Sequence, residues 1–354
     1  MEILRIYQAV DNPYASVNQY VSTLIEGVKS LSREIEFGWG IDTFWCDDIY
    51  SYDIIHIQWP HVLLINNWHS NHLKERLTLI KKRGKKIVAT CHNLVPHYNN
   101  NYDFGVAYET VYNFADMIIH LGPVSKELLS SSYPNAEHVI IPHHIYDTFY
   151  THFPEKEESC KKLKISKKNN YILCYGAFRD DEERLLAQSI SCAYKYNSTY
   201  ILAPSYDFNI KTSFFNRYKY FIKEKLLYQK KHIISLGYKN YTIPNELTPY
   251  FFGAATIVLI QRKKILNSGN VPLAFLMGKV VVGPNIGNVG RLLNETGNPT
   301  FDVNDIDSLK KAIDNGFQLA NDNYGEKNRT FAFSNLSTNI ISQKLYEHYC
   351  TLIH

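Results

Sequence analysis

The chain has 354 residues, and at the usual ~150 residues per domain this length suits about two domains, each large enough for its own hydrophobic core. Apolar residues make up 45% and charged residues 20% of the chain, which excludes a disordered tail and a collagen-like repeat. Lys and Arg exceed Asp and Glu by 38 to 34, and a net charge of +4 is too small to indicate a nucleic-acid-binding protein.

The six cysteines are scattered, without a CxxC pair or a histidine at metal-ligand spacing, so we expect reduced thiols and no structural metal. The N-terminus carries an acid at Glu2 and turns polar by Asp11, and it therefore lacks the basic start and apolar core of a signal peptide. No stretch approaches the ~18 consecutive apolar residues of a membrane-spanning helix. The sequence predicts a cytoplasmic protein.

Short apolar runs alternate with longer amphipathic ones, which is typical of parallel sheets covered by helices. Asn12 and the proline after it predict a helix start, because apolar residues from Val17 to Leu31 then recur at helical spacing. Further helices are predicted at 72–82 and 124–131. The strands predicted in the first half are 3–10, 35–39, 54–59, 86–91, 117–121 and 138–142.

The alternation repeats in the second half. Strands are predicted at 171–175, 200–202, 233–236, 256–260 and 280–283, and helices at 181–196, 214–228, 244–252, 271–277 and 306–319. A last helix over 336–352 carries one apolar face. The sequence thus predicts an α/β protein with two doubly wound, Rossmann-like domains that face each other across a cleft at the carboxyl ends of their sheets.

A polar, Lys-rich stretch that follows Pro154 separates the two halves and indicates an interdomain linker. The predicted divisions are an N-terminal domain over 1–155, the linker over 156–170, a C-terminal domain over 171–333 and the last helix over 334–354.

Basic loops follow two strands of the second half. Gly176 permits close backbone approach and Arg179 lies just beyond it, while Arg262 follows a buried run that ends at Ile260. Because the planar fork of an arginine binds two oxygens at once, two such loops at one sheet edge indicate a phosphorylated ligand. A salt-bridged surface cluster is the alternative explanation for the basic residues 262–264.

Ser268, Gly269 and Asn270 precede an apolar helix, where free backbone N–H groups and the helix dipole form an anion site suited to a diphosphate. Ser268 or Asn270 can equally be a plain helix cap. In the first half, His92 follows a buried strand, where it can donate to a sugar hydroxyl or exchange a proton near neutral pH. A structural histidine is about as common at such a position.

Several other classes are disfavoured. His143 and His144 follow another strand, but adjacent side chains diverge and no carboxylate is spaced with them, which argues against zinc. The absence of GxGxxG, GxxxxGK[ST] and GxSxG argues against an NAD enzyme, a P-loop ATPase and a serine hydrolase. Basic and aromatic patches over 74–86 and 211–231 fit either an anionic membrane surface or a solvated helix face.

Together these residues resemble the nucleotide-sugar glycosyltransferases of the GT-B fold, in particular the GT4-like bacterial polysaccharide enzymes. The resemblance runs over nearly the whole chain as an order of short motifs: Asn12-Pro13-Tyr14, 56–60 (HIQWP), 90–97 (TCHNLVPH), 141–143 (IPH), 175–179 (YGAFR), and Ser268-Gly269 before 278–282 (GKVVV).

The resemblance implies a nucleotide-sugar donor held by the second domain, a saccharide or lipid-linked acceptor held by the first, and a last helix that crosses back to the first domain. It implies that His92 contacts the transferred sugar and that no metal or other cofactor is required. The residues expected to hold the donor diphosphate, by arginine side chains and by backbone amides, are Gly176, Arg179, Arg262, Ser268, Gly269 and Asn270. The residues expected to bind the acceptor are Asn12, Tyr14, Asn93, His97 and His143.

Two features depart from the family pattern. The pair of glutamates seven residues apart is absent, and Leu266 and Leu273 occupy the nearest positions. The lysine that often follows the arginine of the first C-terminal loop is replaced by acids at Asp181 and Glu182. The expected function is transfer of a hexose from a UDP- or GDP-sugar in glycan biosynthesis, at the inner face of the membrane if the acceptor is lipid-linked. The alternatives are a catalytically weak GT-B homologue that serves as a partner subunit, and a sugar-nucleotide epimerase of the same fold.

Overall fold

The computed structural model describes residues 3–64, 69–94, 102–179, 182–193, 196, 198–206, 233–236, 238 and 243–353. The chain forms two compact units. Unit 1 comprises Met1–Phe149 and Asn335–His354, and unit 2 comprises Tyr150–Ser334. Each unit is built around a six-stranded sheet.

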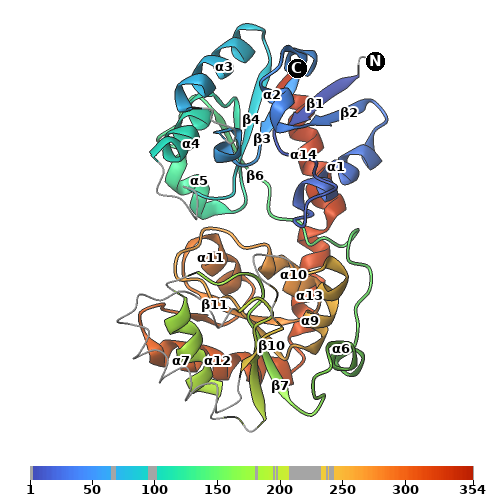
Figure 1. Cartoon of the computed structure of the whole chain (residues 1–354), viewed down its shortest axis with the longest axis vertical. Helices are drawn as coiled ribbons and strands as arrows, with labels where there is room; N and C mark the ends of the chain where they lie inside the picture. Colours follow the sequence, from blue (N-terminus) through green and yellow to red (C-terminus); the bar gives the residue numbers. More distant parts are fainter. Residues whose placement is uncertain are drawn as a thin grey trace. The chain divides into compact units, whose positions relative to one another are not determined.

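In unit 1 the strand order is β2-β1-β3-β4-β5-β6, and every described pair is parallel (Figure 1). The strands are β1 (Leu4–Gln8), β2 (Ile35–Trp39), β3 (Ile54–Ile57), β4 (Lys86–Cys91), β5 (Met117–His120) and β6 (Glu137–Ile140). The helices are α1 (Tyr20–Leu31), α2 (Ile41–Phe44), α3 (Ser70–Lys82), α4 (Tyr102–Phe114), α5 (Pro123–Leu129) and α14 (Thr338–Ile353), with 3-10 turns η1 (Asp47–Ser51) and η2 (Pro60–Leu64). Every residue of β3 and β5 is buried, because helices cover both faces of such a sheet.

The last helix, α14, packs against α1 in unit 1, as the sequence predicts (Figure 1). Gly27 on α1 permits this close approach, since a Cβ there would lie 2.1 Å from Ser342 Oγ. Ile341, Leu345 and Tyr349 are buried on α14. At ~1.5–3 kcal/mol for each fully buried aliphatic side chain, Ile341 and Leu345 anchor α14 in unit 1.

In unit 2 the strand order is β12-β11-β10-β7-β8-β9, and the described pairs are again parallel. The strands are β7 (Asn170–Leu173), β8 (Thr199–Leu202), β9 (Ile233–Ile234), β10 (Ile257–Leu259), β11 (Val280–Pro284) and β12 (Thr300–Phe301). The helices are α6 (Lys156–Leu163), α7 (Glu183–Ala193), α9 (Thr248–Ala254), α10 (Asn270–Leu276), α11 (Gly287–Glu295), α12 (Ile306–Asn321) and α13 (Gly325–Leu336), with a 3-10 turn η3 (Asn245–Leu247). The core of the unit lies between this sheet, α7 and α12.

The stretch 156–170 is not the interdomain linker that its polar composition predicts. It contains α6, whose Cys160 and Leu163 are buried, and this helix packs against α9. Gly253 on α9 permits the contact, because a Cβ there would lie 2.2 Å from Ser159 Oγ. Two apolar positions in so short a helix are too few to appear as helical periodicity, so the segment looks like a solvated loop in the sequence. The boundary between the units falls before this stretch.

Asn12 and the proline after it do not begin a helix. The helix α1 begins at Tyr20, and the residues before it form turns in which Asn12 Oδ1 accepts the Tyr14 N–H (3.0 Å) and Asn18 Oδ1 accepts the Tyr20 N–H (3.1 Å). Val17 is 56% exposed and does not join the buried face of α1. Asparagine closes such turns as readily as it caps helices, so the residue type does not distinguish the two uses.

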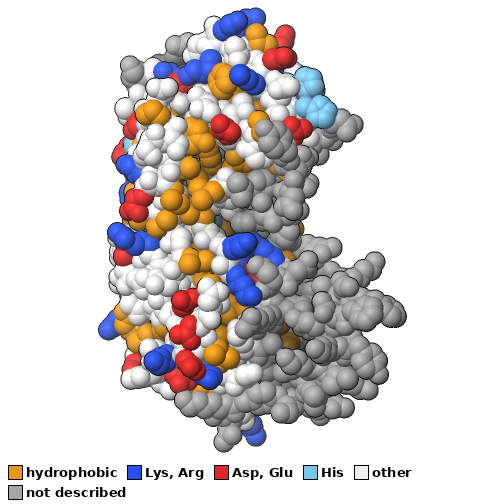
Figure 2. Space-filling model, turned by 90° about the vertical axis from the view of Figure 1, so that its left-hand side faces the viewer, with side chains coloured by type: hydrophobic (Ala, Val, Ile, Leu, Met, Phe, Trp, Pro, Cys, Tyr) orange, Lys and Arg blue, Asp and Glu red, His pale blue; other side chains and the backbone are white. Residues whose placement is uncertain are grey.

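The basic patches differ in what the structure shows of them. The patch over 211–231, with the helix predicted at 214–228, lies outside the described residues. The patch over 74–86 is partly neutralised, since Lys81 pairs with Asp116. Figure 2 shows basic and acidic side chains interspersed on the face that it draws. None of the helices in the described part of the chain has the length and apolar composition needed to cross a membrane.

Candidate functional site

The strand order of unit 2 reverses direction between β7 and β10. From β7 the chain adds β8 and β9 on one side, and it then returns to add β10 on the other. In parallel sheets of this kind, ligands bind in the crevice beyond the carboxyl ends of the two strands at which the order reverses. The loop after β7 carries Arg179 and the loop after β10 carries Arg262.

A buried carboxylate joins these two arginines. Arg262 Nη1 donates to Glu182 Oε2, and the backbone N–H of Arg179 donates to the same oxygen at 3.0 Å. Arg179 Nε lies 3.9 Å from Glu182 Oε1, and Arg179 Nη1 donates to the Lys264 carbonyl at 3.0 Å. The side chains of Arg262 and Arg179 are only 11% and 17% exposed. Protein atoms therefore fix both guanidinium groups in place.

The charge of this cluster is small. Two guanidinium groups and one ionised carboxylate, +2 and −1, leave a net charge of +1. Burial raises the pKa of the Glu182 carboxyl, while the charges of Arg262 and Arg179 act in the opposite direction. An anion that binds both guanidinium groups competes with the Glu182 carboxylate for these two cations. The acid therefore weakens a diphosphate site relative to a site lined by cations alone.

Gly176 lies beside Arg262 and Asn270 and has a φ of +94°, a conformation that favours glycine. A Cβ at this position would lie 3.8 Å from both Arg262 Nη2 and Asn270 Nδ2, so two nitrogen donors border the space over the glycine. The Asn270 amide also donates to the Tyr175 carbonyl at 2.9 Å, which holds the loop in place. The structure thus brings together Gly176, Arg179, Arg262 and Asn270, four of the residues predicted to hold the donor.

Ser268 and Gly269 form the turn that starts α10, with Gly269 at the N-cap position. Ser268 Oγ accepts the backbone N–H of Asn270 at 3.3 Å, so that N–H is bonded within the turn. The amide side chain of Asn270 is the part that reaches the glycine loop. Asn288 secures the preceding loop, because its side-chain amide donates to Asn267 Oδ1 at 2.8 Å. Oxygen binding by the backbone amides of this turn stays a prediction.

The strand order of unit 1 reverses between β1 and β3, and His92 follows the next strand, β4. His92 Nε2 lies 2.9 Å from Gln58 Oε1, and the imidazole stacks on the Trp59 indole with ring centroids 4.6 Å apart. The Tyr20 ring packs edge-on against His92, and its centroid lies 4.6 Å from that of His143. Residues from the segment after β3, from the start of α1 and from the loop after β6 therefore surround the imidazole.

A buried polar network lies beneath this site. Gln58 Nε2 donates to Gln8 Oε1 at 3.0 Å, and Gln8 Nε2 donates to the Tyr349 hydroxyl at 3.3 Å. The Tyr349 hydroxyl lies 2.6 Å from His56 Nδ1, and His56 Nε2 lies 2.7 Å from Thr90 Oγ1. The network therefore connects three neighbouring strands to the last helix of the chain.

Burial keeps the histidines of this region uncharged near neutral pH. It lowers the pKa of His56 to about 3 and that of His143 to about 4, and it lowers the pKa of His92 and His144 well below the usual value. A neutral His92 whose Nε2 faces the Gln58 oxygen carries its proton on that nitrogen. His92 is therefore suited to hydrogen bonding and not to neutralising a negative charge.

The remaining residues predicted to bind an acceptor have other contacts. The Tyr14 ring packs edge-on against Trp39, with ring centroids 5.3 Å apart. The Asn93 backbone carbonyl accepts the Tyr112 hydroxyl at 3.3 Å. His97 lies outside the described residues.

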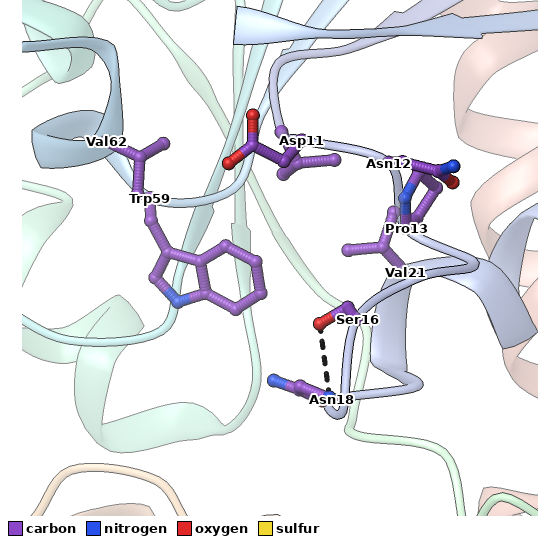
Figure 3. A pocket seen from close by; sticks show the side chains of 9 residues that line it. Asp11, Asn12, Pro13, Ser16, Asn18, Val21, Trp59 and Val62 are labelled. Atoms are coloured by element: carbon purple, nitrogen blue, oxygen red, sulfur yellow. Dashed lines mark hydrogen bonds between the residues drawn. The ribbon is translucent and has the colours of Figure 1, made fainter. Parts of the chain in front are cut away.

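A pocket of about 180 Å³ lies at the strand reversal of unit 1 (Figure 3). Its walls come from the segment after β1, from α1 and from the residues after β3, and they comprise Val10, Asp11, Asn12, Pro13, Ser16, Asn18, Val21, Trp59 and Val62. Figure 3 shows the Asp11 carboxylate turned toward the side on which the Trp59 indole lies. The Asn18 N–H donates to Ser16 Oγ at 3.1 Å and fixes the far end of the loop.

Comparison with known proteins gives matches among solved structures alone, since no family model and no curated protein matches the sequence. Sucrose-phosphate synthase from Thermosynechococcus elongatus matches with a TM-score of 0.70 and 14% identity over 99% of each chain. HepE from Anabaena, solved with UDP, matches with a TM-score of 0.70 and 12% identity over 99% of this chain and 100% of that chain. A protein from Listeria monocytogenes assigned as UDP-N-acetylglucosamine 2-epimerase matches with a TM-score of 0.61 and 10% identity over 97% of this chain and 95% of that chain.

The chain has the GT-B fold. The fold predicted from the sequence is therefore confirmed, while the closer resemblance to GT4-like enzymes stays a prediction. In this GT-B chain, both strand reversals carry residues that the sequence singles out. Among the described residues, no group of three or more His, Cys, Asp or Glu side chains is arranged to hold a metal ion.

Sequence reasoning missed several residues of the two sites. Gln8 and Gln58 stand at the ends of buried strands, and a polar residue there is a usable signal. In the sequence Glu182 shows only as an acid in place of a lysine, and its pairing with two arginines depends on the folded loop. Tyr349 lies 293 residues from His56, and nothing near it in the sequence indicates their contact.

Proposed function

We propose that this protein is a glycosyltransferase that moves a hexose from a UDP- or GDP-linked sugar to a saccharide or lipid-linked saccharide in glycan biosynthesis. The observation that carries the proposal is the pair Arg179 and Arg262 at the strand reversal of unit 2. Each guanidinium group can bind two oxygens of a diphosphate at once, and a nucleotide sugar is therefore a suitable ligand class. HepE, which matches this fold, is solved with UDP and with UDP-glucose, and this supports the proposal.

In this proposal the donor diphosphate lies over Gly176, where the absence of a Cβ lets its oxygens approach the backbone. Arg262 Nη2 and Asn270 Nδ2 border that space and donate to the oxygens. Arg179 adds positive charge from the loop after β7, which also carries Gly176. Ser268 and Gly269 complete the site from the turn before α10.

The proposed reaction joins an acceptor hydroxyl oxygen to the anomeric carbon of the donor sugar and breaks the bond from that carbon to the diphosphate. The hydroxyl gives up its proton to solvent water, and the nucleoside diphosphate leaves with the bonding electron pair. Arg179 and Arg262 stabilise the negative charge that develops on the leaving oxygen, because fixed cations cost no reorganisation at that moment. His92, which Gln58 and Trp59 hold in place, contacts the transferred sugar. The proposal includes no metal or other cofactor and places the reaction in the cytoplasm, at the inner face of the membrane for a lipid-linked acceptor.

A second candidate is a catalytically weak GT-B homologue that serves as the partner of an active transferase. Glu182 favours this candidate, because its carboxylate already binds both arginines at a place where the family resemblance has a lysine. An epimerase is a third candidate, which the match to the Listeria protein supports. The reaction observed distinguishes the three candidates. Sugar transfer to an added acceptor indicates the glycosyltransferase, and isomerisation of a UDP-sugar without acceptor indicates the epimerase. No turnover indicates the catalytically weak homologue.

The test of the donor site is a titration with UDP, GDP and CDP in the absence of added metal. A ligand that binds only the folded state raises the melting temperature, and calorimetry then gives its affinity. Arg179→Ala and Arg262→Ala should each weaken binding by ~1.5–3 kcal/mol, or ~10–150-fold. Arg291→Ala is the matched control, because Arg291 is exposed and pairs with Glu295 within α11. Unchanged nucleotide affinity in both the Arg179 and the Arg262 variants would contradict the proposed donor site.

A further inference from the structure

The pocket at the strand reversal of unit 1 has no role in donor binding as proposed above. We propose that it binds one neutral pyranose ring of the acceptor, with Trp59 as the stacking surface and Asp11 as the acceptor of hydroxyl hydrogen bonds. This inference rests on the proposed function, because it names the class of acceptor for that reaction.

The position of the pocket is the first argument. Asp11 follows β1 and Trp59 follows β3, and these are the neighbouring strands between which the order of the sheet reverses. The crevice beyond such strand ends is where ligands bind in open parallel sheets. The corresponding place in unit 2 holds Arg179 and Arg262, so each unit carries distinct side-chain chemistry at its own reversal.

The size of the pocket is the second argument. Its volume of about 180 Å³ is below the ~300–1,000 Å³ of pockets that enclose drug-sized ligands. It therefore suits one small ring with one edge open to solvent, and it excludes an enclosed nucleotide or oligosaccharide.

The chemistry of the walls is the third argument. A pyranose has apolar C–H faces and a rim of hydroxyls, so it needs a flat apolar surface together with hydrogen-bond acceptors. Trp59 supplies the surface, and the apolar walls are completed by Val10, Pro13, Val21 and Val62. Among the described residues that line the pocket, Asp11 is the one ionisable group. Its carboxylate accepts hydrogen bonds from hydroxyls and repels a sugar that carries a carboxylate or phosphate.

The rigidity of the stacking surface is the fourth argument. The Trp59 indole stacks on His92 at an interplanar angle of 23°, and His92 is held by Gln58. A surface that is fixed before binding loses little conformational entropy when a ring docks on it. The contact also places the pocket next to His92, which the proposed function puts against the transferred sugar.

The test is saturation-transfer NMR on the full chain with methyl α-glucoside, methyl β-galactoside and glucuronate, each at tens of millimolar. The neutral glycosides should receive saturation, and glucuronate should receive less. Asp11→Asn should weaken neutral glycoside binding by roughly tenfold and remove the discrimination against glucuronate. Trp59→Ala should abolish saturation transfer to the glycosides. Trp59→Phe keeps an aromatic ring and should retain part of that signal, so it serves as a second variant if the alanine variant folds poorly. Trp45→Phe is the matched control, because Trp45 follows α2, packs on Phe44 and does not line the pocket, and this variant should bind as the parent does.

The same samples are titrated with UDP, so that the two proposals fail separately. UDP binding without saturation of either neutral glycoside overturns the pocket proposal. Glycoside binding that is unaffected by both Asp11→Asn and Trp59→Phe also overturns it. Glycoside binding that depends on Asp11 and Trp59, in a protein that binds no nucleotide, supports the pocket and overturns the proposed function.

Discussion

Acidification should destabilise unit 1 selectively, because the histidines of this protein are unevenly distributed. The chain has 14 histidines, and His152 and His232 are the two that fall within Tyr150–Ser334, so the other 12 belong to unit 1. His56 and His120 are almost fully buried, with 1% and 0% of their surface exposed. The perturbation is a decrease in pH from about 7.5 to about 5.5, a range in which an exposed histidine takes up its proton.

The magnitude follows from two pKa values. Burial lowers the pKa of His56 and His120 to about 3, against ~6.5 for an exposed histidine. The unfolded chain therefore binds protons in this range while the folded chain does not, and stability that is present above pH ~6.5 is lost as the pH falls toward 3. Over these two pH units each histidine lowers the free energy of unfolding by ~1.4 kcal/mol, or by ~3 kcal/mol together. That is a large share of the ~5–15 kcal/mol of a typical domain.

Urea unfolding at both pH values measures this loss. Tryptophan fluorescence reports on unit 1, because all four tryptophans belong to it: Trp39, Trp45, Trp59 and Trp68. Hydrogen exchange of peptides from unit 2 reports on the other unit, which should keep its stability. His120→Gln should reduce the loss in unit 1 by ~1.4 kcal/mol, and His152→Gln, at an exposed site in unit 2, should not change it. Equal losses in the two units, or no effect of His120→Gln, would refute the reasoning.

Three further predictions test the sites. Gly176→Ala should lower stability by ~1–2 kcal/mol, since the new residue keeps a positive φ, and should weaken UDP binding, since its Cβ enters the proposed diphosphate space. Gly84→Ala is its control in urea unfolding and UDP titration, because Gly84 has a φ of +72° with nothing within 4 Å of the Cβ position. Tyr349→Phe should lower the stability of unit 1 by ~1–3 kcal/mol in urea unfolding, because it removes a hydrogen bond to buried His56; no loss would contradict the role of the network. EDTA should leave transferase activity unchanged, and a loss that added Mg²⁺ restores would contradict the metal-independent mechanism.

The accuracy of the sequence predictions followed the strength of the local pattern. The strands at 35–39 and 86–91 match β2 and β4 residue for residue. The run 86–91 is apolar apart from Lys86 and Thr90, and in 35–39 the apolar residues alternate with Glu36 and Gly38, and both patterns are typical of strands. The helix α6 was missed because its buried face shows only two apolar side chains, and Asn12 was assigned to a helix because one residue type serves caps and turns alike.

The candidate site divides in the same way. The sequence predicts that Arg179 and Arg262 lie at one edge of the second sheet, because functional residues follow strand ends and the position of a strand fixes where its loop begins. The partners of those arginines depend on how the loops fold back, and this is a tertiary property. The Glu182 carboxylate and the Tyr349 hydroxyl therefore became visible only with the structure.

The discontinuity of unit 1 affects the order in which newly made protein matures. Residues 150–334 form one uninterrupted segment that precedes α14, so the sequence of unit 2 is complete before that of unit 1. Unit 1 at that stage lacks the helix that packs on α1 beside Gly27 and the hydroxyl that Tyr349 supplies to His56. Domains usually mature from the N-terminus during synthesis. In this chain the first unit to be translated is the last to be completed.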